Sequence, residues 1–465
     1  MNAAISRGKQ PRPDLFAARP SRWGSWLPLR VAPHRASSST LAGVYPFLAS
    51  PPADLGVYVG VDALTGAAFC FDPWSLYAAG ALTNPNVLLA GVIGQGKSAL
   101  AKSLAVRSIA AGRRVYVAGD PKGEWAPVAR AAGGTVVALG AGLPARLNPL
   151  DPGPPPPDLH DHAWRTLVRG RRLRLLAAVA EATLGRDLRP VEHGALEAAL
   201  GVAETHDVPT IGDVLLALTR PDAAHTRADG TTTAQRVSDG ADLTHALRRL
   251  VRGDLGGIFD GPSTEVLDPT AAMVVLDLSR IGTDDTALGV AMTCGSAWLE
   301  AALTSALTGP RWVIYDEAWR LLRSLPLVRR MQAQWKLSRS YGIANLLVLH
   351  RLSDLDAIGA AGSEARAIAE GLLADCSTRV VYRQESDQLA ATATTLGLTR
   401  TERDLLPALP RGTGLWKVAG RSYVVRHRLH VDELDLFDTD AAMRDNPRGF
   451  AASGAEISGT EGSVS

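Results

Sequence analysis

A glycine-rich loop between an apolar run and a helix-forming segment constrains this sequence more than any other feature. The residues Gly91-Val-Ile-Gly94-Gln95-Gly96-Lys97-Ser98 satisfy the pattern G-x-x-x-x-G-K-[ST]. The apolar run 86–90 precedes them, and the segment 99–107, rich in helix-forming residues, follows. A strand, a glycine loop and a helix in that order predict a phosphate-binding loop, in which backbone N–H groups surround an anion at a helix N-terminus.

The loop pattern also predicts a role for its individual residues. Lys97 is expected to reach the β- and γ-phosphates of ATP, and the Ser98 hydroxyl is expected to complete the shell of a Mg²⁺ ion. The flanking strand and helix argue against the alternative, a glycine turn ahead of an ordinary helix. The residues predicted to hold the nucleotide are Gly91, Gly94, Gln95, Gly96, Lys97, Ser98 and Ala99.

Short runs rich in Val, Ile and Leu alternate with helix-like segments along most of the chain. Their continuous apolarity is typical of strands covered on both faces, as in a parallel sheet between two layers of helices. The pattern therefore predicts a doubly wound α/β core. The turn residues Ala419-Gly420 lie between two further runs, 414–418 and 422–426, and predict a C-terminal hairpin. The candidate core strands are 86–90, 114–118, 135–139, 273–278, 312–315, 344–349 and 379–382.

The alternation stops after Asn148-Pro149-Leu150 and resumes near residue 272. Between these points the proline run 154–157 leads into helix-like sequence, in which Thr210 followed by Asp213 resembles a helix start. We expect an inserted all-α subdomain in a core of two parts, with a basic arm before it and a flexible tail after it. The expected ranges are 1–45 for the arm, 46–157 and 261–440 for the core, 158–260 for the insertion, and 441–465 for the tail.

Two charged segments each leave alternatives open. The arm is either a solvated tail or a dock for anionic lipid or nucleic acid. The arginines of the first inserted helix either form a solvated face or line a pore or contact a partner. Trp164 and Trp319 are expected to be packing residues. The arginines concerned are Arg165, Arg169, Arg171, Arg172 and Arg174.

A nucleotide site also needs a carboxylate that positions Mg²⁺, and the run 312–315 ends in Asp316-Glu317. We expect Asp316 to hold the metal and Glu317 to polarise the water that attacks the γ-phosphate. The run around 115–118 also ends in acidic residues, Asp120 and Glu124, so Glu124 is the alternative base. We prefer Glu317 because it adjoins the metal carboxylate, and assign Asp120 and Glu124 supporting roles.

Composition excludes several other classes of protein. Lys and Arg total 49 against 47 for Asp and Glu, so net charge identifies no partner. The three cysteines, Cys70, Cys294 and Cys376, are far apart, which argues against a zinc site or a disulfide framework and fits a reducing cytoplasm. No apolar stretch approaches the roughly 18 residues that a membrane span needs.

Four segments in order resemble the ATPases that energise conjugative and type IV secretion systems, the TraC-like branch of the HerA/FtsK superfamily. These segments are the glycine loop 91–98, Asp120-Pro-Lys-Gly-Glu124, Asn148-Pro-Leu150 and Asp316-Glu-Ala-Trp319. Residues 58–74 also resemble that branch. The resemblance spans about residues 55–440 and implies a RecA-like P-loop NTPase domain that acts as a homo-hexamer, with ATP sites between subunits.

The resemblance implies two further site residues. Such rings use an arginine from the neighbouring subunit, and Arg339 matches its position best, with Arg383 in reserve. A glutamine that senses the γ-phosphate commonly ends the next strand, where this chain has His350, so the sensor role of His350 depends on histidine replacing glutamine. The predicted catalytic set is therefore Glu317, Lys97, Arg339 and His350, with Ser98 and Asp316 at the metal.

Together these features predict an ATPase that hydrolyses ATP and drives a conjugative or type IV secretion apparatus. Implied partners are further copies of the chain, components of the apparatus and DNA, in the cytoplasm or at the inner face of the cell membrane. One alternative is a double-stranded DNA translocase of the FtsK or HerA kind. The other is a scaffold that binds ATP without hydrolysing it.

Overall fold

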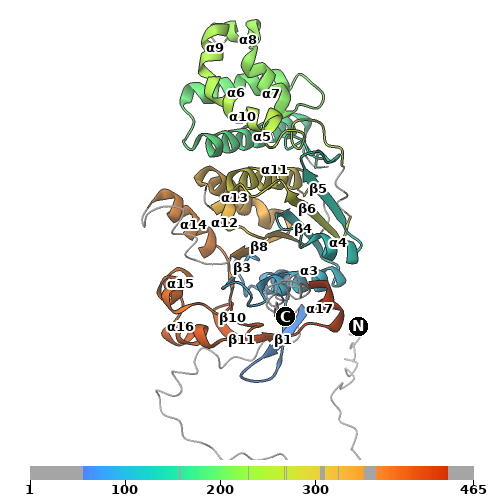
Figure 1. Ribbon diagram of the computed structural model, residues 1–465, viewed down its shortest axis with the longest axis vertical. Helices are drawn as coiled ribbons and strands as arrows, with labels where there is room; N and C mark the ends of the chain where they lie inside the picture. The colour runs from blue at the N-terminus through green and yellow to red at the C-terminus, as the bar shows by residue number, and fades with distance from the viewer. Residues whose placement is uncertain are drawn as a thin grey trace, which may run out of the picture. The chain divides into compact units, whose positions relative to one another are not determined.

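An eleven-stranded sheet organises the protein (Figure 1). The computed structural model describes residues 56–156, 159–228, 230–265, 268, 270–303, 309–322, 324–349 and 363–437. The strand order is β2-β1-β11-β10-β9-β3-β8-β7-β4-β6-β5. From β9 to β5 all neighbouring strands are parallel. The parallel strands are β3 (Val87–Ala90), β4 (Arg114–Asp120), β5 (Thr135–Gly140), β6 (Met273–Arg280), β7 (Arg311–Tyr315), β8 (Ile343–Leu349) and β9 (Thr378–Val381).

The predicted α/β fold with a mainly parallel sheet is therefore confirmed, and every predicted strand is present with its ends shifted by at most two residues. Consecutive buried side chains enter opposite layers: Leu88 packs in one hydrophobic core and Leu89 in the other. One layer contains α3 (Lys97–Ala110) and α4 (Ala126–Ala131), whereas α11 (Asp285–Leu303) and α13 (Leu325–Ser338) belong to the other. Coverage on both faces explains why the strands carry continuous apolar runs.

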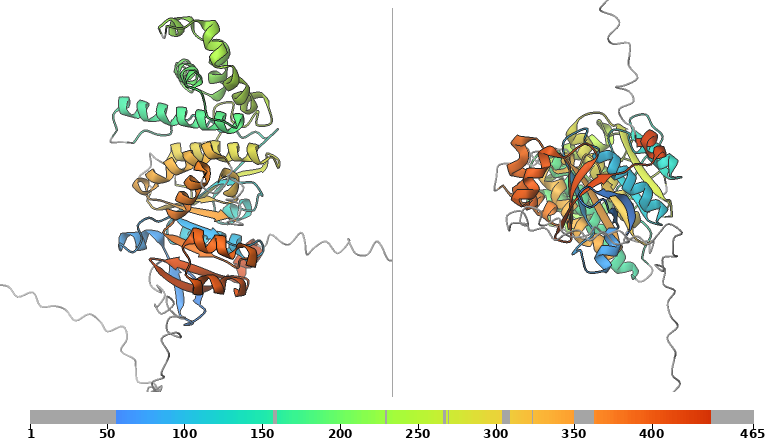
Figure 2. Two further views of the ribbon diagram at one scale, coloured as in Figure 1. Left: turned by 90° about the vertical axis from the view of Figure 1, so that its left-hand side faces the viewer. Right: turned by 90° about the horizontal axis from the view of Figure 1, so that it is seen from below.

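Four antiparallel strands extend one side of the sheet. The predicted hairpin is formed by β10 (Thr413–Val418) and β11 (Arg421–His427), and its turn residues Ala419 and Gly420 have φ of 53° and 73°. Positive φ at both positions is the geometry of a tight two-residue hairpin turn. The strands β1 (Val57–Asp62) and β2 (Ala68–Phe71) were not predicted from the sequence. Since β1 pairs with β11, the first and last described strands lie side by side (Figure 2).

Helices occupy the stretch between β5 and β6. The predicted start at Thr210 is confirmed, because its side chain caps α7 and Asp213 bonds back to the Thr210 amide. The first helix, α5, packs on α11 and α13 of the core (Figure 1). These helices are α5 (Asp161–Leu184), α6 (Pro190–Ala203), α7 (Ile211–Thr219), α8 (Ala223–Ala228), α9 (Thr233–Asp239) and α10 (Ala241–Arg252).

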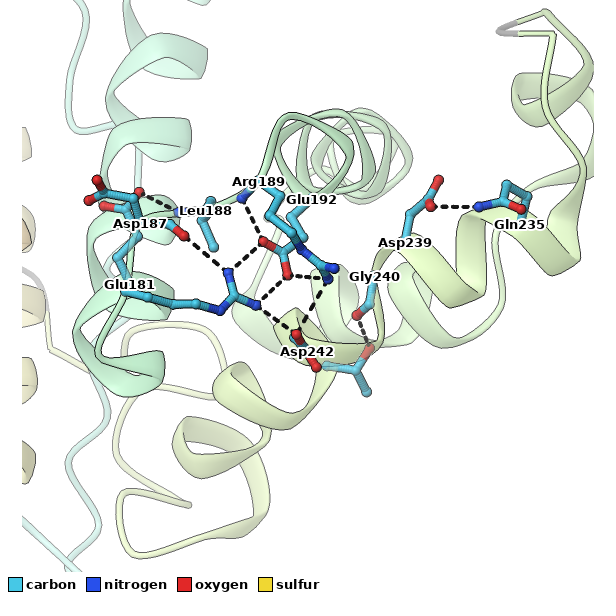
Figure 3. A network of polar contacts seen from close by, with 11 residues as sticks. Glu181, Asp187, Leu188, Arg189, Glu192, Gln235, Asp239, Gly240 and Asp242 are labelled. Atoms are coloured by element: carbon cyan, nitrogen blue, oxygen red, sulfur yellow. Dashed lines mark hydrogen bonds and ion pairs between the residues drawn. The ribbon is translucent and has the colours of Figure 1, made fainter.

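A buried carboxylate ties these helices together (Figure 3). Glu192 of α6 has no solvent exposure and accepts two hydrogen bonds, of 2.7 and 2.9 Å, from the guanidinium of Arg186. Arg186 also donates to Asp242 of α10 at 2.6 Å. Because removal of one partner would leave a buried charge uncompensated, this network fixes the packing of α6 against α10.

The interpretation of the arginines of α5 as a solvated face or a pore lining is wrong for two of them. Arg171 and Arg172 are 4% and 8% exposed. Arg171 donates to the carbonyl oxygens of Asp151 and Pro152, and Arg172 donates to the carbonyl oxygen of Leu150 and to Glu204. They are buried because they satisfy the backbone of the incoming loop. Arg165 and Arg174 are exposed, whereas Trp164 is buried and the guanidinium of Arg171 lies over its ring, 5.9 Å from the centroid.

The Asn148-Pro-Leu150 segment fastens the chain where it enters and leaves this helical stretch. The buried Asn148 amide donates to the Pro209 carbonyl oxygen at 2.9 Å, and its backbone N–H donates to Ser263 Oγ at 2.8 Å. These two hydrogen bonds therefore hold residues 148, 209 and 263 next to one another.

The remaining elements complete the two helical layers and the C-terminal region. Within the described residues, no helix is long and apolar enough to span a bilayer, and Cys70, Cys294 and Cys376 are buried. The predicted arm 1–45, the tail 441–465 and His350 lie outside the described residues. The remaining helices are α2 (Pro73–Ala78), α12 (Trp319–Leu322), α14 (Glu364–Ala374), α15 (Leu389–Leu396), α16 (Arg400–Leu405) and α17 (Val431–Phe437).

Candidate functional site

The glycine loop connects buried β3 to α3 at the carboxyl edge of the parallel strands. Gly91, Gly94 and Gly96 have φ of 155°, 79° and 98°, a region that L-residues with side chains avoid. A β-carbon on Gly91 would also lie 2.5 Å from the β-carbon of Tyr382, which follows β9. Two separate constraints, backbone conformation and close approach, therefore require glycine at position 91.

The N-terminus of α3 is arranged to receive an anion. Gly96 is its N-cap and offers no side chain to the first amides of the helix, and the first turn contains no acidic residue. Lys97 is 4% exposed, and its Nζ donates to the carbonyl oxygens of Gly91 and Val92 at 2.5 and 2.9 Å. Uncapped amides, the helix dipole and a lysine together favour phosphate at this point.

A pocket of about 810 Å³ opens in front of the loop. This volume lies within the usual range for small-molecule sites, roughly 300–1,000 Å³. Of the residues predicted to hold the nucleotide, Gly94, Gly96, Lys97, Ser98 and Ala99 line the pocket. Gly91 and Gln95 do not line it: Gly91 packs against Tyr382, and the Gln95 carbonyl oxygen accepts the Gly412 N–H at 3.0 Å.

The residues of the far wall of this pocket were not predicted from the sequence. Residues just before β10, at and after the end of β11, and in the C-terminal helix α17 form it, and they include both apolar and ionisable side chains. Such a surface suits a nucleoside, which has a flat base and a polar ribose. No local pattern marks these positions in the sequence, because they meet the loop only through the folding of β10 and β11. They are Arg411, Gly412, His427, Arg428, Leu429, Leu434, Asp435 and Phe437.

Asp316 and Glu317 lie at the same edge of the sheet as the loop, because β7 and β3 are parallel and both pair with β8. Asp316 is 8% exposed; its carboxylate accepts the Trp125 indole N–H at 2.9 Å and the Glu317 amide at 3.0 Å. Burial raises the pKa of Asp316, and the nearby Glu317 and Glu124 add to the rise. The charge of this carboxylate is therefore costly, and a cation would stabilise it.

Glu317 is held on both oxygens. Its Oε2 accepts the Trp319 indole N–H at 2.6 Å, and its Oε1 forms an ion pair with Lys122. The side chain is 4% exposed, and its backbone has φ of 54°, which costs energy for a residue other than glycine. The prediction that Trp319 only packs is therefore incomplete. Neither Asp316 nor Glu317 lines the pocket, but Lys122 does.

Asp120 and Glu124 have identifiable partners. The Asp120 carboxylate accepts the amides of Glu124 and Trp125 at 3.1 and 2.7 Å, just before α4, and burial raises its pKa to about 6. Glu124 lines the pocket and accepts from Lys102, a fully buried lysine of α3, at 3.3 Å. Asp120 thus stabilises the turn between β4 and α4. Glu124 lines the pocket, and its carboxylate is held by the buried Lys102.

The ligand set fits a magnesium ion shared with a nucleotide. Among the described residues, no three His, Cys, Asp or Glu side chains gather as a metal site. Mg²⁺ typically takes one or two protein oxygens and fills its other positions with phosphate and water. The Ser98 hydroxyl and the buried Asp316 carboxylate can supply these oxygens.

The two candidate arginines lie at opposite ends of the parallel strands, Arg339 before β8 and Arg383 after β9. Arg339 is exposed and precedes β8, so the length of the strand, about 20 Å at ~3.3 Å per residue, separates it from the edge that carries the loop. Arg383 is exposed and follows β9, and its carbonyl oxygen accepts the Val92 N–H at 3.2 Å. Arg383 therefore lies beside the loop of its own chain, whereas Arg339 lies at the other end of β8 from that loop.

Comparison with known structures identifies proteins with the same fold. VirB4 of Thermoanaerobacter pseudethanolicus superposes with a TM-score of 0.67 and 21% identity, over 83% of this chain and 100% of that one. The plasmid coupling protein TrwB, in complex with a non-hydrolysable ATP analogue, gives 0.54 and 15%, over 85% and 93%. TrwB in complex with ADP and Mg²⁺ gives 0.51 and 17%, over 74% and 85%.

These likenesses confirm the predicted RecA-like P-loop fold. No protein-family model matches the sequence, and no curated protein matches it. At these low identities the agreement concerns the fold. The chemistry must be argued from the site itself.

Proposed function

We propose that this protein is an ATPase that powers a conjugative or type IV secretion apparatus. The observation that carries the proposal is the placement of the glycine loop, which lines a pocket of nucleotide size, at the same end of the parallel strands as the Asp316-Glu317 pair. The fold shared with VirB4 and with TrwB, which is described as a bacterial conjugative coupling protein, supports the assignment to secretion or conjugation.

The loop binds the triphosphate. The backbone N–H groups from Gly94 to Ser98 surround the β-phosphate at the start of α3, while Lys97 leaves the carbonyl oxygens of its own loop and contacts the β- and γ-phosphates. The wall formed by β11 and α17 holds the nucleoside. Ser98 and Asp316 hold Mg²⁺, which supplies positive charge to the phosphates when it is bound.

Hydrolysis requires a general base within the subunit and a positive charge from a neighbouring subunit. Glu317 orients the attacking water and accepts its proton. Arg339 of one copy is proposed to reach the site of the adjacent copy in a ring of six, since its own loop lies at the opposite edge of the sheet. His350, the proposed sensor of the γ-phosphate, follows β8, the strand between the loop strand and the carboxylate strand.

The setting and the partners follow from the same resemblance. We propose that the ring works in the cytoplasm or at the inner face of the cell membrane, and that it acts with components of the secretion apparatus. DNA is a further candidate partner. These proposals rest on the fold shared with VirB4 and TrwB.

Hydrolysis of ATP by the purified full chain tests the function, measured with Mg²⁺, with and without double-stranded DNA, and alongside the mass in solution. The proposal expects phosphate release that requires Mg²⁺ and rises as rings form. Strong stimulation by DNA that falls steeply with salt would favour a direct DNA translocase. Binding of ATP without phosphate release from assembled rings would favour the scaffold.

A further inference from the structure

Lys122 touches both parts of the proposed site. Its ammonium group forms an ion pair with Oε1 of Glu317, and its side chain is 51% exposed and lines the pocket in front of the glycine loop. Lys122 lies in the turn after β4, the strand next to β7, and its side chain lines the pocket. Its ammonium group can therefore pair either with Glu317 or with an anion bound in the pocket.

In the arrangement observed, two donors compete with water for the Glu317 carboxylate. Lys122 occupies one carboxylate oxygen and the Trp319 indole occupies the other, at 2.6 Å. A general base must offer an oxygen to the water that it deprotonates, within about 2.6–3.2 Å. Trp319 lies only two residues after Glu317 in the same chain segment, so this contact is local. Lys122 comes from the segment after β4, and its contact with Glu317 is the one that can be exchanged.

We propose that Lys122 passes from Glu317 to the terminal phosphate of a bound nucleoside triphosphate, and that this exchange makes the site respond to ATP rather than ADP. The inference rests on the proposed function. Because Glu317 must face the water that attacks the γ-phosphate, a lysine in contact with Glu317 lies next to the γ-phosphate position. A diphosphate places no charge there, so Lys122 keeps Glu317 occupied when ADP is bound.

The neighbouring lysine shows what a fixed contact looks like. Lys102 is fully buried and pairs with Glu124 at 3.3 Å, so its head group has no space in which to move. The exposed head of Lys122 lies at the end of a flexible four-carbon stem and can move between partners without unfolding anything. The two lysine–glutamate pairs at the same edge of the sheet therefore have different roles.

If the exchange occurs, the effects of substituting Lys122 and Glu317 on the affinity for a nucleoside triphosphate depend on each other, whereas their effects on ADP affinity do not. Equilibrium binding of a non-hydrolysable ATP analogue and of ADP, each with Mg²⁺, would be measured for wild type, Lys122→Met, Glu317→Gln and the double variant. Glu317→Gln removes the competing charge and is expected to tighten binding of the analogue by about fivefold, in the usual range of coupling energies. Lys122→Met is expected to weaken it by about tenfold, and ADP affinity should change less than about twofold in both.

The double variant shows whether the effect of Glu317→Gln on binding of the analogue depends on Lys122. If Lys122 transmits the effect, Glu317→Gln gives no tightening in the Lys122→Met background. Lys122→Arg should retain most of the analogue affinity, and Lys336→Met, an exposed lysine of α13, serves as the matched control. A tightening by Glu317→Gln that persists without Lys122, or an equal loss of ADP and analogue affinity in Lys122→Met, would overturn the inference.

Failure of the proposed function gives a different result. If the site holds no nucleotide, wild type binds neither ADP nor the analogue. If the protein is a scaffold, wild type binds the analogue but releases no phosphate from ATP. Melting temperatures of the four proteins, compared without nucleotide, show whether each variant remains folded.

Discussion

The two sides of the pocket are built in different ways. The phosphate side consists of backbone: three glycines with positive φ, the uncapped N-terminus of α3 and a lysine bonded to its own loop. The carboxylate side consists of buried side chains from separate strands, each already occupied by a partner such as Trp125 or Lys122. On the phosphate side the backbone is already in place and only Lys97 changes partners, whereas on the carboxylate side Glu317 must exchange Lys122 for water before it can act. Binding and hydrolysis should therefore be separable by mutation.

The largest effect is expected from a residue on neither side. Arg339→Ala should lower turnover of the assembled ring by about a thousandfold, because a trans-acting arginine contributes about that much in related chemistry. Mixing Arg339→Ala subunits with Glu317→Gln subunits should restore hydrolysis, since some interfaces then combine an intact base with an intact arginine. Arg400→Ala, an exposed residue of α16, is the control. Mixed rings that stay inactive would show that Arg339 does not act between subunits.

Glu317→Gln separates the two sides directly. It should lower turnover by about a hundredfold or more, the usual contribution of a general base, without weakening nucleotide binding. Glu124→Gln is the matched control at the same edge of the sheet and should cost less than about tenfold, because Glu124 pairs with the fixed Lys102. Single-turnover phosphate release would measure both. The reverse order of effects would transfer the role of base to Glu124.

Gly91→Ala tests whether the phosphate side is fixed by its backbone. The variant needs φ of 155° and places its β-carbon 2.5 Å from that of Tyr382, so it should lower the free energy of unfolding by about 2 kcal/mol. Gly80→Ala is the matched control, with φ of 70° and no atom within 4 Å of the added carbon, and should cost about 1 kcal/mol. Urea unfolding would compare them. Equal costs would mean that the contact with Tyr382 relaxes freely.

The smallest effect concerns the far wall. Burial lowers the pKa of His427 to about 4, and Arg107 adds to the shift. The unfolded chain binds a proton below pH 6.5, but the folded protein does so only near pH 4, so stability falls as the pH drops through this window. At about pH 5.5 the loss is ~1 kcal/mol. His427→Gln should flatten this part of the pH profile of unfolding; an unchanged profile would mean that the pKa of His427 does not differ between the folded and unfolded protein.

The phosphate side could be predicted from the sequence because its residues are contiguous. Strand, loop and helix occupy residues 86–107, so local pattern and chemistry coincide. The same holds for Asp316 and Glu317 at the end of β7 and for the turn at Ala419 and Gly420. In each case short-range geometry decides the structure.

The remaining features depend on contacts between distant segments. Nothing near Lys122 in the sequence indicates that it meets Glu317, and nothing near Phe437 indicates that α17 borders the pocket. Arg171 and Arg172 resemble surface residues in the sequence, yet they are buried because the incoming loop offers carbonyl oxygens that only the fold brings within reach. The short strands β1 and β2 are stabilised as strands by pairing with each other and with β11.

Calorimetry with Mg²⁺ and a non-hydrolysable ATP analogue tests most directly whether the glycine loop holds a nucleoside triphosphate. Wild type should release heat on binding one analogue per chain, and Lys97→Ala should weaken that binding at least about thirtyfold, the loss of a charge-assisted phosphate contact, while remaining folded. Wild-type protein that gives no heat, or Lys97→Ala protein that binds as tightly as wild type, would contradict the proposed site.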